Sequence, residues 1–434
     1  MARAEAAWQG LPMTMAEKML AAASGRQSCR AGDILHPDPA LVILHDGYIE
    51  AAYNELRGIG YRRITHPERV VFVTDHDVIY TSARVAERAG NIRRIAKEWS
   101  VGHFSDVGQN GHGHIFPMET GMVRAGMFLF AYDMHCTNFG AIGAFAMAVG
   151  PEVSVVLATG KLMTEVPRSI RVKLLGTLQP GVHTRDLGFK LSHSLTSKPG
   201  MPFDGRVFEF SGPAVSRMPV ASRVGLCSTL TEIGASNVLF PPVTLEGDAI
   251  AEQSWMEGDD AAGFEGEIEL RLDELSPQVA LPGSPDNAAG IEQAGGRRID
   301  HAYIGSCASA MYEDFCAAAK IMRNRKIAPG VRMVIVPGTT RIAKRLADEG
   351  ILQIFLDAGA TILPSGCGPC AGGRSGFLAP GEVSISTAAT NTAGRMGAAT
   401  SEAYLGSPLT VAASAVAGHI ADPRQLMKEG LRHA

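Results

Sequence analysis

Residues 127–146 read MFLFAYDMHCTNFGAIGAFA, in which an apolar run passes directly into the polar sequence DMHC at 133–136. The run at 127–131 predicts a buried strand, because it is short, apolar and bounded by polar and turn-forming residues. A glycine-containing turn and an apolar helix are expected to follow it. Since similar apolar runs alternate with helical patterns along the chain, the sequence predicts an α/β fold.

Other segments extend this alternation and indicate how the chain is divided. Strict alternation of polar and apolar residues at 267–272 (EIELRL) predicts a half-exposed strand. A stretch rich in Pro and Gly at 276–296 indicates a connector between domains. We expect three α/β domains, at 1–165, 166–290 and 291–434. The other expected strands are 70–73, 127–131, 153–157 and 331–336, and the expected helices are 83–98, 312–322 and 341–349.

The composition of the 434-residue chain excludes several classes of protein. With 40 Lys and Arg against 44 Asp and Glu, the formal charge of −4 provides no basic surface for nucleic acid or an anionic membrane. Seven cysteines, an odd number in a long chain, fit reduced thiols better than a disulfide framework. The first residues lack a signal-peptide core, and the most apolar stretch is too interrupted to span a bilayer. We therefore expect a cytoplasmic protein that binds neither nucleic acid nor membranes.

Polar side chains follow three of the expected strands at the point where each strand ends. Asp75 and His76 follow one of them. Asp133 and His135 follow a second, and Cys307 follows a third, which is expected at 303–304. Ligands in open α/β sheets bind beyond the carboxyl ends of the strands, so these residues predict one shared site. The alternative for each strand end taken alone is an ordinary loop with a polar turn residue.

Three cysteines offer a set of metal ligands. Cys367 and Cys370 form a C-x-x-C pair, and Cys307 adds a third thiolate. Four thiolates are usual in structural zinc sites and simple iron–sulfur clusters, so three thiolates would leave one iron of a four-iron cluster open to substrate. A redox C-x-x-C and a zinc-bound or cluster-free scaffold stay open as alternatives. Cys316, inside an expected helix, is interpreted as a core residue.

Several short motifs occur in a fixed order over almost the whole chain. They are HDG, FVTDHD, HIFPMETG, EIGA, IGSC followed by YEDF, GCGPCAGG and GRMG. In this order they resemble the aconitase superfamily, and most closely its branch of isopropylmalate isomerase (3-isopropylmalate dehydratase) and homoaconitase large subunits. The resemblance implies a three-domain α/β large subunit, with mixed and parallel sheets around a central iron–sulfur cluster and with the swivel domain absent.

The resemblance also implies a [4Fe-4S] cluster held by Cys307, Cys367 and Cys370, and a hydro-lyase acting on a 2-hydroxy di- or tricarboxylic acid. Histidines suit its proton transfers because their pKa lies near neutrality, and a guanidinium group binds a carboxylate through two hydrogen bonds. By motif position, the catalytic residues are Asp75, His76, His114, Asp133, His135 and Glu232, and the substrate contacts include His45 and Arg395.

Two positions on the substrate side depart from the family pattern. Met134 stands where the family has a serine, and Thr390 stands where it has one of two carboxylate-binding arginines. Arg374, shortly after the cysteine pair, would partly replace the missing cation. Losing a desolvated Arg–carboxylate pair costs on the order of 2–5 kcal/mol. We therefore expect an altered substrate of the citraconate, dimethylmalate or maleate type, or another small hydroxy acid.

The last residues of the chain resemble the terminus of the family's large subunits. The resemblance therefore implies a separate small subunit, which carries the swivel domain and supplies the catalytic serine. The alternative is a non-catalytic, iron-sensing or RNA-binding relative of aconitase. The negative net charge argues against that alternative, because nucleic-acid binding depends on contacts from Lys and Arg to phosphates.

Overall fold

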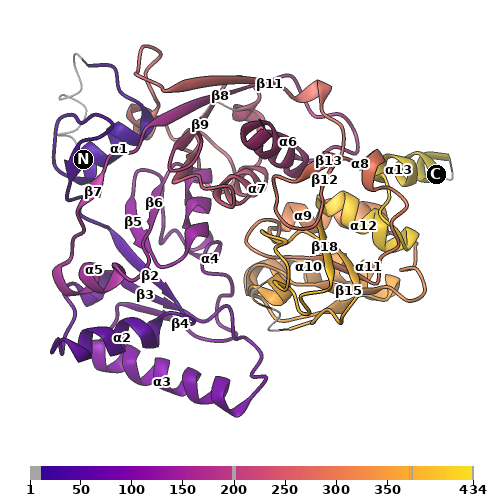
Figure 1. Cartoon of the computed structure of the whole chain (residues 1–434), viewed down its shortest axis with the longest axis horizontal. Helices are drawn as coiled ribbons and strands as arrows, with labels where there is room; N and C mark the ends of the chain where they lie inside the picture. Colours follow the sequence, from indigo (N-terminus) through magenta and orange to yellow (C-terminus); the bar gives the residue numbers. More distant parts are fainter. Residues whose placement is uncertain (1–10, 198–201, 371, 373–374, 433–434) are drawn as a thin grey trace.

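The structure, a computed structural model, describes residues 11–197, 202–370, 372 and 375–432. Three large sheets form its framework, with strands drawn from 41–148, 169–271 and 278–405 in turn (Figure 1). A short antiparallel pair, β1 (Ile34–Leu35) with β7 (Thr164–Glu165), lies outside them. None of the described helices combines the length and the apolar character that crossing a bilayer requires.

The first sheet is parallel, in the order β4-β3-β2-β5-β6, and is buried on both faces. Successive side chains of a strand point to opposite faces, so β3 contributes to two cores. Phe72 packs with Trp99 of α3 in one core, whereas Val71 and Val73 belong to the other. Figure 1 shows α2 and α3 side by side against this sheet. The elements are α1 (Met15–Ala23), β2 (Leu41–His45), α2 (Ile49–Gly58), β3 (Val70–Val73), α3 (Ala83–Trp99), β4 (His103–Ser105), α4 (Phe116–Glu119), β5 (Phe128–Ala131), β6 (Phe145–Ala148) and α5 (Val153–Thr159).

The second sheet is also parallel, in the order β10-β9-β8-β11, with β11 at its edge. Burial alternates along β11, and its exposed residue Glu269 pairs with Lys173 of β8 at 3.3 Å. The expected half-exposed strand at 267–272 is therefore confirmed. The elements are β8 (Ser169–Leu175), α6 (Thr184–Ser197), β9 (Val207–Ser211), α7 (Val220–Thr231), β10 (Asn237–Leu239) and β11 (Gly266–Arg271).

The third sheet is mixed, in the order β13-β12-β18-β17-β14-β15-β16. Strands β12 and β13, which the expected division assigns to the second domain, belong to this sheet because β12 pairs with β18. The strands are β12 (Gln278–Ala280), β13 (Ala288–Gly290), β14 (His301–Ile304), β15 (Arg332–Ile335), β16 (Thr361–Ile362), β17 (Val383–Ser386) and β18 (Glu402–Leu405). The helices are α8 (Ile291–Ala294), α9 (Tyr312–Met322), α10 (Thr340–Asp348), α11 (Ile351–Ala358), α12 (Pro408–Ala417) and α13 (Pro423–Arg432).

One expected strand is wrong. Residues 153–157 form the start of helix α5, which buries Val153, Val156 and Leu157 and exposes Val155. Burial at i, i+3 and i+4 is the period of a helix, so this apolar run follows the helical period and not that of a strand. The apolar helix expected after Asp133 is a 3-10 helix, η2 (Met134–Ile142). The other expected strands and helices are confirmed to within two residues at each end.

Candidate active site

Three neighbouring strand ends of the first sheet carry acidic and imidazole side chains of the site. His45 is the last residue of β2, and Asp75 and His76 follow β3, its parallel neighbour. On the other side of β2, strand β5 ends two residues before Asp133. Parallel strands bring their carboxyl ends to one edge of a sheet, and the polar residues meet there for that reason.

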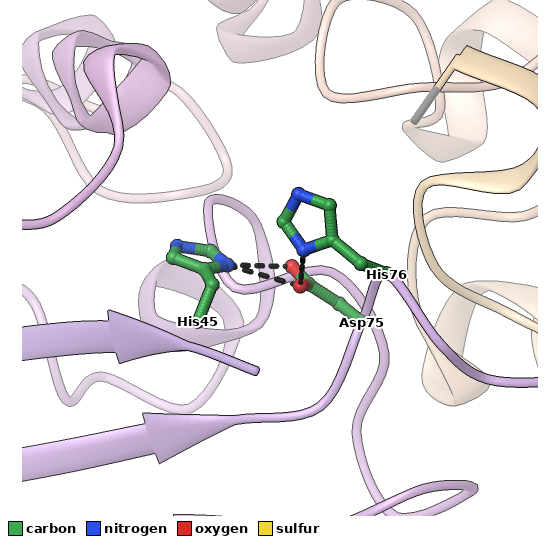
Figure 2. Close-up of side chains that lie close together, drawn as sticks. All are labelled: His45, Asp75 and His76. Carbon is green, nitrogen blue, oxygen red and sulfur yellow. Dashed lines mark hydrogen bonds and ion pairs between the residues drawn. The ribbon is translucent and has the colours of Figure 1, made fainter. Parts of the chain in front are cut away.

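Asp75 is fully buried between two imidazole rings, as Figure 2 shows. Nδ1 of His45 lies 3.0 Å from both carboxylate oxygens, and Nδ1 of His76 lies 2.9 Å from Oδ1. The amide N–H of Gly113 donates to Oδ2 at 2.8 Å. Burial raises the pKa of Asp75, but His45 and His76 outweigh it and hold that pKa well below its usual range. Asp75 is therefore an ionised carboxylate.

Asp46 is a second carboxylate at His76. Its Oδ1 lies 3.0 Å from Nδ1 of His76, and its Oδ2 accepts the amide N–H of Asp77 at 2.8 Å. Burial by itself lowers the pKa of His76, whereas Asp75 and Asp46 together raise it well above its ordinary value. The ring of His76 is held as an imidazolium with Nδ1–H directed to the carboxylates, and it lines the cavity.

Asp133 organises a second pair of histidines. Its Oδ1 lies 3.1 Å from Nε2 of His114, and it also accepts the amide N–H of His135 at 2.9 Å. Nε2 of His135 lies 2.9 Å from Oε1 of Glu232. Burial lowers the pKa of His114 to about 4, which leaves this ring neutral at pH 7. Burial also lowers the pKa of His135, but Cys307, Asp133 and Glu232 raise it well above its ordinary value.

A single cavity joins these residues to the three cysteines. Cys307 follows β14, Cys367 directly precedes the 3-10 turn η6 (Gly368–Cys370), and Cys370 ends that turn. The residues that line the cavity are His76, His112, His114, Asp133, His135, Ser306, Cys307, Cys367, Cys370 and Arg395. We call His45, Asp75, His76, His114, Asp133 and His135 the Asp–His group, and Cys307, Cys367 and Cys370 the cysteine group.

The cysteine loop packs directly on the backbone of Asp75. The amide N–H of Cys367 donates to the carbonyl oxygen of Asp75 at 2.9 Å. Gly366 makes this approach possible, since a Cβ at that position would lie 2.6 Å from the same oxygen, and its φ of 152° also favours glycine. The first and third sheets therefore meet at the site itself.

The remaining predicted residues lie at different depths. Thr390 is buried, and burial raises the pKa of Glu232 while His135, and to a lesser degree Thr390, lower it below its ordinary value. Arg395 lines the cavity, whereas Met134 at the start of η2 is 42% exposed. Arg374 lies outside the described residues.

The sequence reasoning missed four residues of this region. Asp46 and His112 each stand one or two positions from a predicted histidine, in HDG and GHGH, so adjacency was the available signal. Asn138 donates to the carbonyl oxygen of Cys307 at 3.1 Å, and no sequence signal marked it. Arg185 is fully buried, donates to the carbonyl oxygen of Ala388 and interacts electrostatically with Cys307 and Cys370.

Known proteins similar to this chain agree with its motifs. Residues 17–297 and 291–418 match the model of the aconitase family (aconitate hydratase). The 3-isopropylmalate dehydratase large subunit 1 of Methanopyrus kandleri is 36% identical over 420 residues, which cover 95% of this chain and 99% of that protein. Large subunit 1 of the same enzyme from Pyrococcus furiosus is 35% identical over 424 residues, with 96% and 99% covered.

Among solved structures, that of Thermococcus kodakaraensis aconitase X in its holo-form resembles this one. Its TM-score is 0.52 at 12% sequence identity, and the match covers 90% of this chain and 92% of that one. At this identity the likeness concerns the fold alone, and it confirms the expected aconitase-like α/β architecture. From its motifs, its fold and these relatives, the chain belongs to the aconitase family of hydro-lyases.

Proposed function

We propose that the chain is the large subunit of a [4Fe-4S]-dependent hydro-lyase that acts on a 2-hydroxy di- or tricarboxylic acid. The observation that carries this proposal is the convergence of four members of the Asp–His group and the whole cysteine group on one cavity, the four being His76, His114, Asp133 and His135. Removing water from a hydroxy acid requires an acid, a base and an electrophile close together. The Asp–His group supplies proton donors and acceptors, and the cysteine group supplies ligands for the electrophile.

The residues present fit an iron–sulfur cluster. All three cysteines are at least 93% buried yet line a cavity, and sulfur ligands favour iron–sulfur chemistry. Burial, reinforced by Asp75, raises the pKa of Cys367 well above its usual value. Burial also raises the pKa of Cys370. Such thiols become stable thiolates when a metal replaces their protons. When bound, the cluster supplies a Lewis acid to the substrate's hydroxyl and carboxylate groups.

The chain's own residues then divide the remaining work. His76, held protonated by Asp75 and Asp46, donates a proton to the leaving hydroxyl. Asp133 orients His114 and His135 at the same cavity, and Glu232 holds the second of these rings. Arg395 presents a guanidinium group to a substrate carboxylate. His45 orients Asp75, and we propose that it is a second substrate contact beside Arg395.

We propose that a separate small subunit completes the site with the catalytic serine. The relatives are named large subunits, and large exposed apolar residues flank the cavity residues in sequence. Tyr80 follows His76 by four positions, Met134 follows Asp133, and Phe377 is 60% exposed shortly after the cysteine pair. Exposed apolar side chains near a site are typical of an interface with another protein.

We propose that the substrate is smaller or less charged than isopropylmalate. Thr390, which helps to lower the pKa of Glu232, stands at the position where the family has an arginine, so this cation is absent from the described site. Met134 presents a thioether where the family has a hydroxyl. These two differences favour a citraconate, dimethylmalate or maleate type of acid, since both remove groups that bind polar parts of a substrate. Arg374 remains a candidate cation.

The test is to reconstitute the chain anaerobically with iron and sulfide, add a small subunit, and assay a panel of acids. The panel contains isopropylmalate, citraconate, dimethylmalate, maleate and homoaconitate. We expect turnover of at least one of the smaller acids, and none by the large subunit alone. Turnover of isopropylmalate at the efficiency of its dedicated enzymes contradicts the altered substrate. RNA binding at physiological salt without turnover supports the non-catalytic alternative.

Two broader expectations are also kept as proposals. The division into domains at 1–165, 166–290 and 291–434 is supported by the three sheets, with β12 and β13, at the end of the second span, paired into the third sheet. A cytoplasmic location is supported by free cysteines throughout the described chain, which suit a reducing compartment.

A further inference from the structure

We propose that His112 is a positioning residue for the cofactor site, whose Nε2–H donates a hydrogen bond to Sγ of Cys367 and so tunes that cysteine as a cluster ligand. The inference rests on the proposed function, because it takes Cys367 to be such a ligand. It concerns a residue that the family motifs leave without a role, since the second histidine of GHGH, His114, is the one that matches them.

The backbone around His112 is held firmly. Its amide N–H donates to the carbonyl oxygen of Gly338 at 2.8 Å, and its own carbonyl oxygen accepts the amide N–H groups of Ile115 and Phe116 at 3.0 Å. The first of these bonds connects the loop between β4 and α4 to the segment after β15, so it ties the first sheet to the third. The side chain is only 2% exposed. Little freedom remains for the ring.

The hydrogen bonds decide which ring nitrogen carries the proton. Nδ1 of His112 accepts the amide N–H of His114 at 3.2 Å, so Nδ1 is unprotonated and the hydrogen lies on Nε2. Asp75 is 3.5 Å from Nδ1, but its carboxylate already accepts from Gly113, His45 and His76. A protonated Nδ1 would leave the buried amide of His114 without an acceptor, which is costly.

The resulting donor is directed at sulfur. Nε2 of His112 lies 3.3 Å from Sγ of Cys367, within hydrogen-bonding range for a sulfur acceptor. The amide of Cys367 is bound to Asp75, and its carbonyl oxygen accepts the hydroxyl of Tyr303 at 3.0 Å, so the sulfur itself is well placed. A neutral N–H donor draws electron density from a thiolate without adding a charge, and hydrogen bonds to the sulfurs help to set cluster potentials.

The experiment compares two variants of the full chain after anaerobic reconstitution. His112→Leu removes the donor, whereas His112→Gln keeps an N–H near the position of Nε2. His301→Leu is the matched control, because His301 is also fully buried but lies at the far end of β14 from Cys307. The readouts are the reduction potential of the cluster, followed by EPR, and the rate at which the cluster is lost to a chelator.

We expect His112→Leu to shift the reduction equilibrium about tenfold toward the oxidised cluster, which is about 59 mV for one electron. Cluster loss to the chelator is expected to be roughly tenfold faster. His112→Gln and His301→Leu are expected to stay close to the wild type. Unchanged potential and unchanged cluster loss in His112→Leu overturn the proposal, as does a His112→Gln variant that behaves like His112→Leu.

A second measurement leaves out His112→Leu and so guards against misfolding of that variant. In chains labelled with ¹⁵N-histidine, pulsed EPR of the reduced cluster is expected to show a nitrogen coupling that is altered in His112→Gln and unchanged in His301→Leu. An identical spectrum in all three chains contradicts the hydrogen bond. A wild-type chain that takes up no cluster refutes the proposed cofactor, and with it this inference. A wild type that takes up the cluster isolates the role of His112.

Discussion

The two sides of the cavity differ in whether the protein's own side chains balance the charges that the site's chemistry requires. In the Asp–His group, Asp75 is buried with two imidazole partners, and Asp133 has two more. In the cysteine group, burial raises the pKa of Cys367 and Cys370, so these thiols are not thiolates until something positive binds them. The difference indicates that one side is preorganised for proton transfer by folding alone, whereas the other side depends on a cofactor.

The sharpest test of this difference removes a cysteine ligand. We expect Cys370→Ser to abolish cluster uptake and to reduce turnover, measured with the small subunit, by about 10³-fold or more, because the Lewis acid contributes several kcal/mol. Visible absorption of the reconstituted chain checks the cluster. Cys316→Ser, on α9 and away from the cavity lining, is the control and is expected to keep both. A Cys370→Ser chain with full absorption and turnover contradicts the conclusion that the cysteine side depends on a cofactor.

The second test removes the central carboxylate of the Asp–His group. Asp75→Asn keeps the shape but takes away the charge that holds His45 and His76, so we expect turnover to fall about 10²–10⁴-fold. The cluster is expected to remain, since Cys367 contacts the backbone of Asp75 and not its carboxylate. Steady-state kinetics and visible absorption are measured on the same sample. Loss of the cluster together with turnover shows that the two sides are not separable.

The third test concerns substrate choice, which we propose depends on Met134 and Thr390. The double variant Met134→Ser, Thr390→Arg restores the family pattern, and a regained Arg–carboxylate pair of about 2 kcal/mol corresponds to a roughly 30-fold gain in preference for isopropylmalate. The ratio of kcat/KM for isopropylmalate and citraconate measures it. The single variant Thr390→Arg is the control that separates the effect of the arginine from that of Met134→Ser. An unchanged ratio in both variants places specificity elsewhere.

The pH profile tests the protonation of His76. Because Asp75 and Asp46 raise its pKa, the imidazolium persists at neutral pH and is lost as the pH rises through that raised value. Asp46→Asn removes one of the two charges, so the alkaline limb of kcat is expected to move down by about one pH unit. Asp38→Asn, whose carboxylate is half exposed beside Arg69, is the control and leaves the limb in place. If the alkaline limb does not move in Asp46→Asn, it reports a group other than His76.

The smallest expected effect concerns the support of the cysteine group. Asn138→Ala removes the bond to the carbonyl oxygen of Cys307, so we expect the free energy of unfolding to fall by about 1 kcal/mol. Urea unfolding of the cofactor-free chain measures it. Since the cluster ligands are untouched, reconstitution is expected to succeed. A loss of cluster uptake in this variant would instead give Asn138 a direct part in the cofactor site.

Local pattern predicted most elements but failed where two periods compete. The apolar run at 70–73 forms strand β3, whereas the similar run at 153–157 forms helix α5. Both runs are rich in β-branched residues, which favour strands. Only the packing of Val153, Val156 and Leu157 on one face, with Val155 in solvent, distinguishes the helix, and burial is not visible in a short run.

The sequence by itself determined the family, the order of the elements and the residue types at the strand ends, because these follow from motifs and short-range periodicity. Tertiary structure decided which nitrogen faces which carboxylate. Asp46 and His112 join the site only because β2 and β3 lie side by side and because the loop before α4 meets the segment after β15. Such pairings depend on backbone contacts between residues that lie 28 positions apart, as His45 and Val73 do, or 226 positions apart, as His112 and Gly338 do, and no local pattern encodes them.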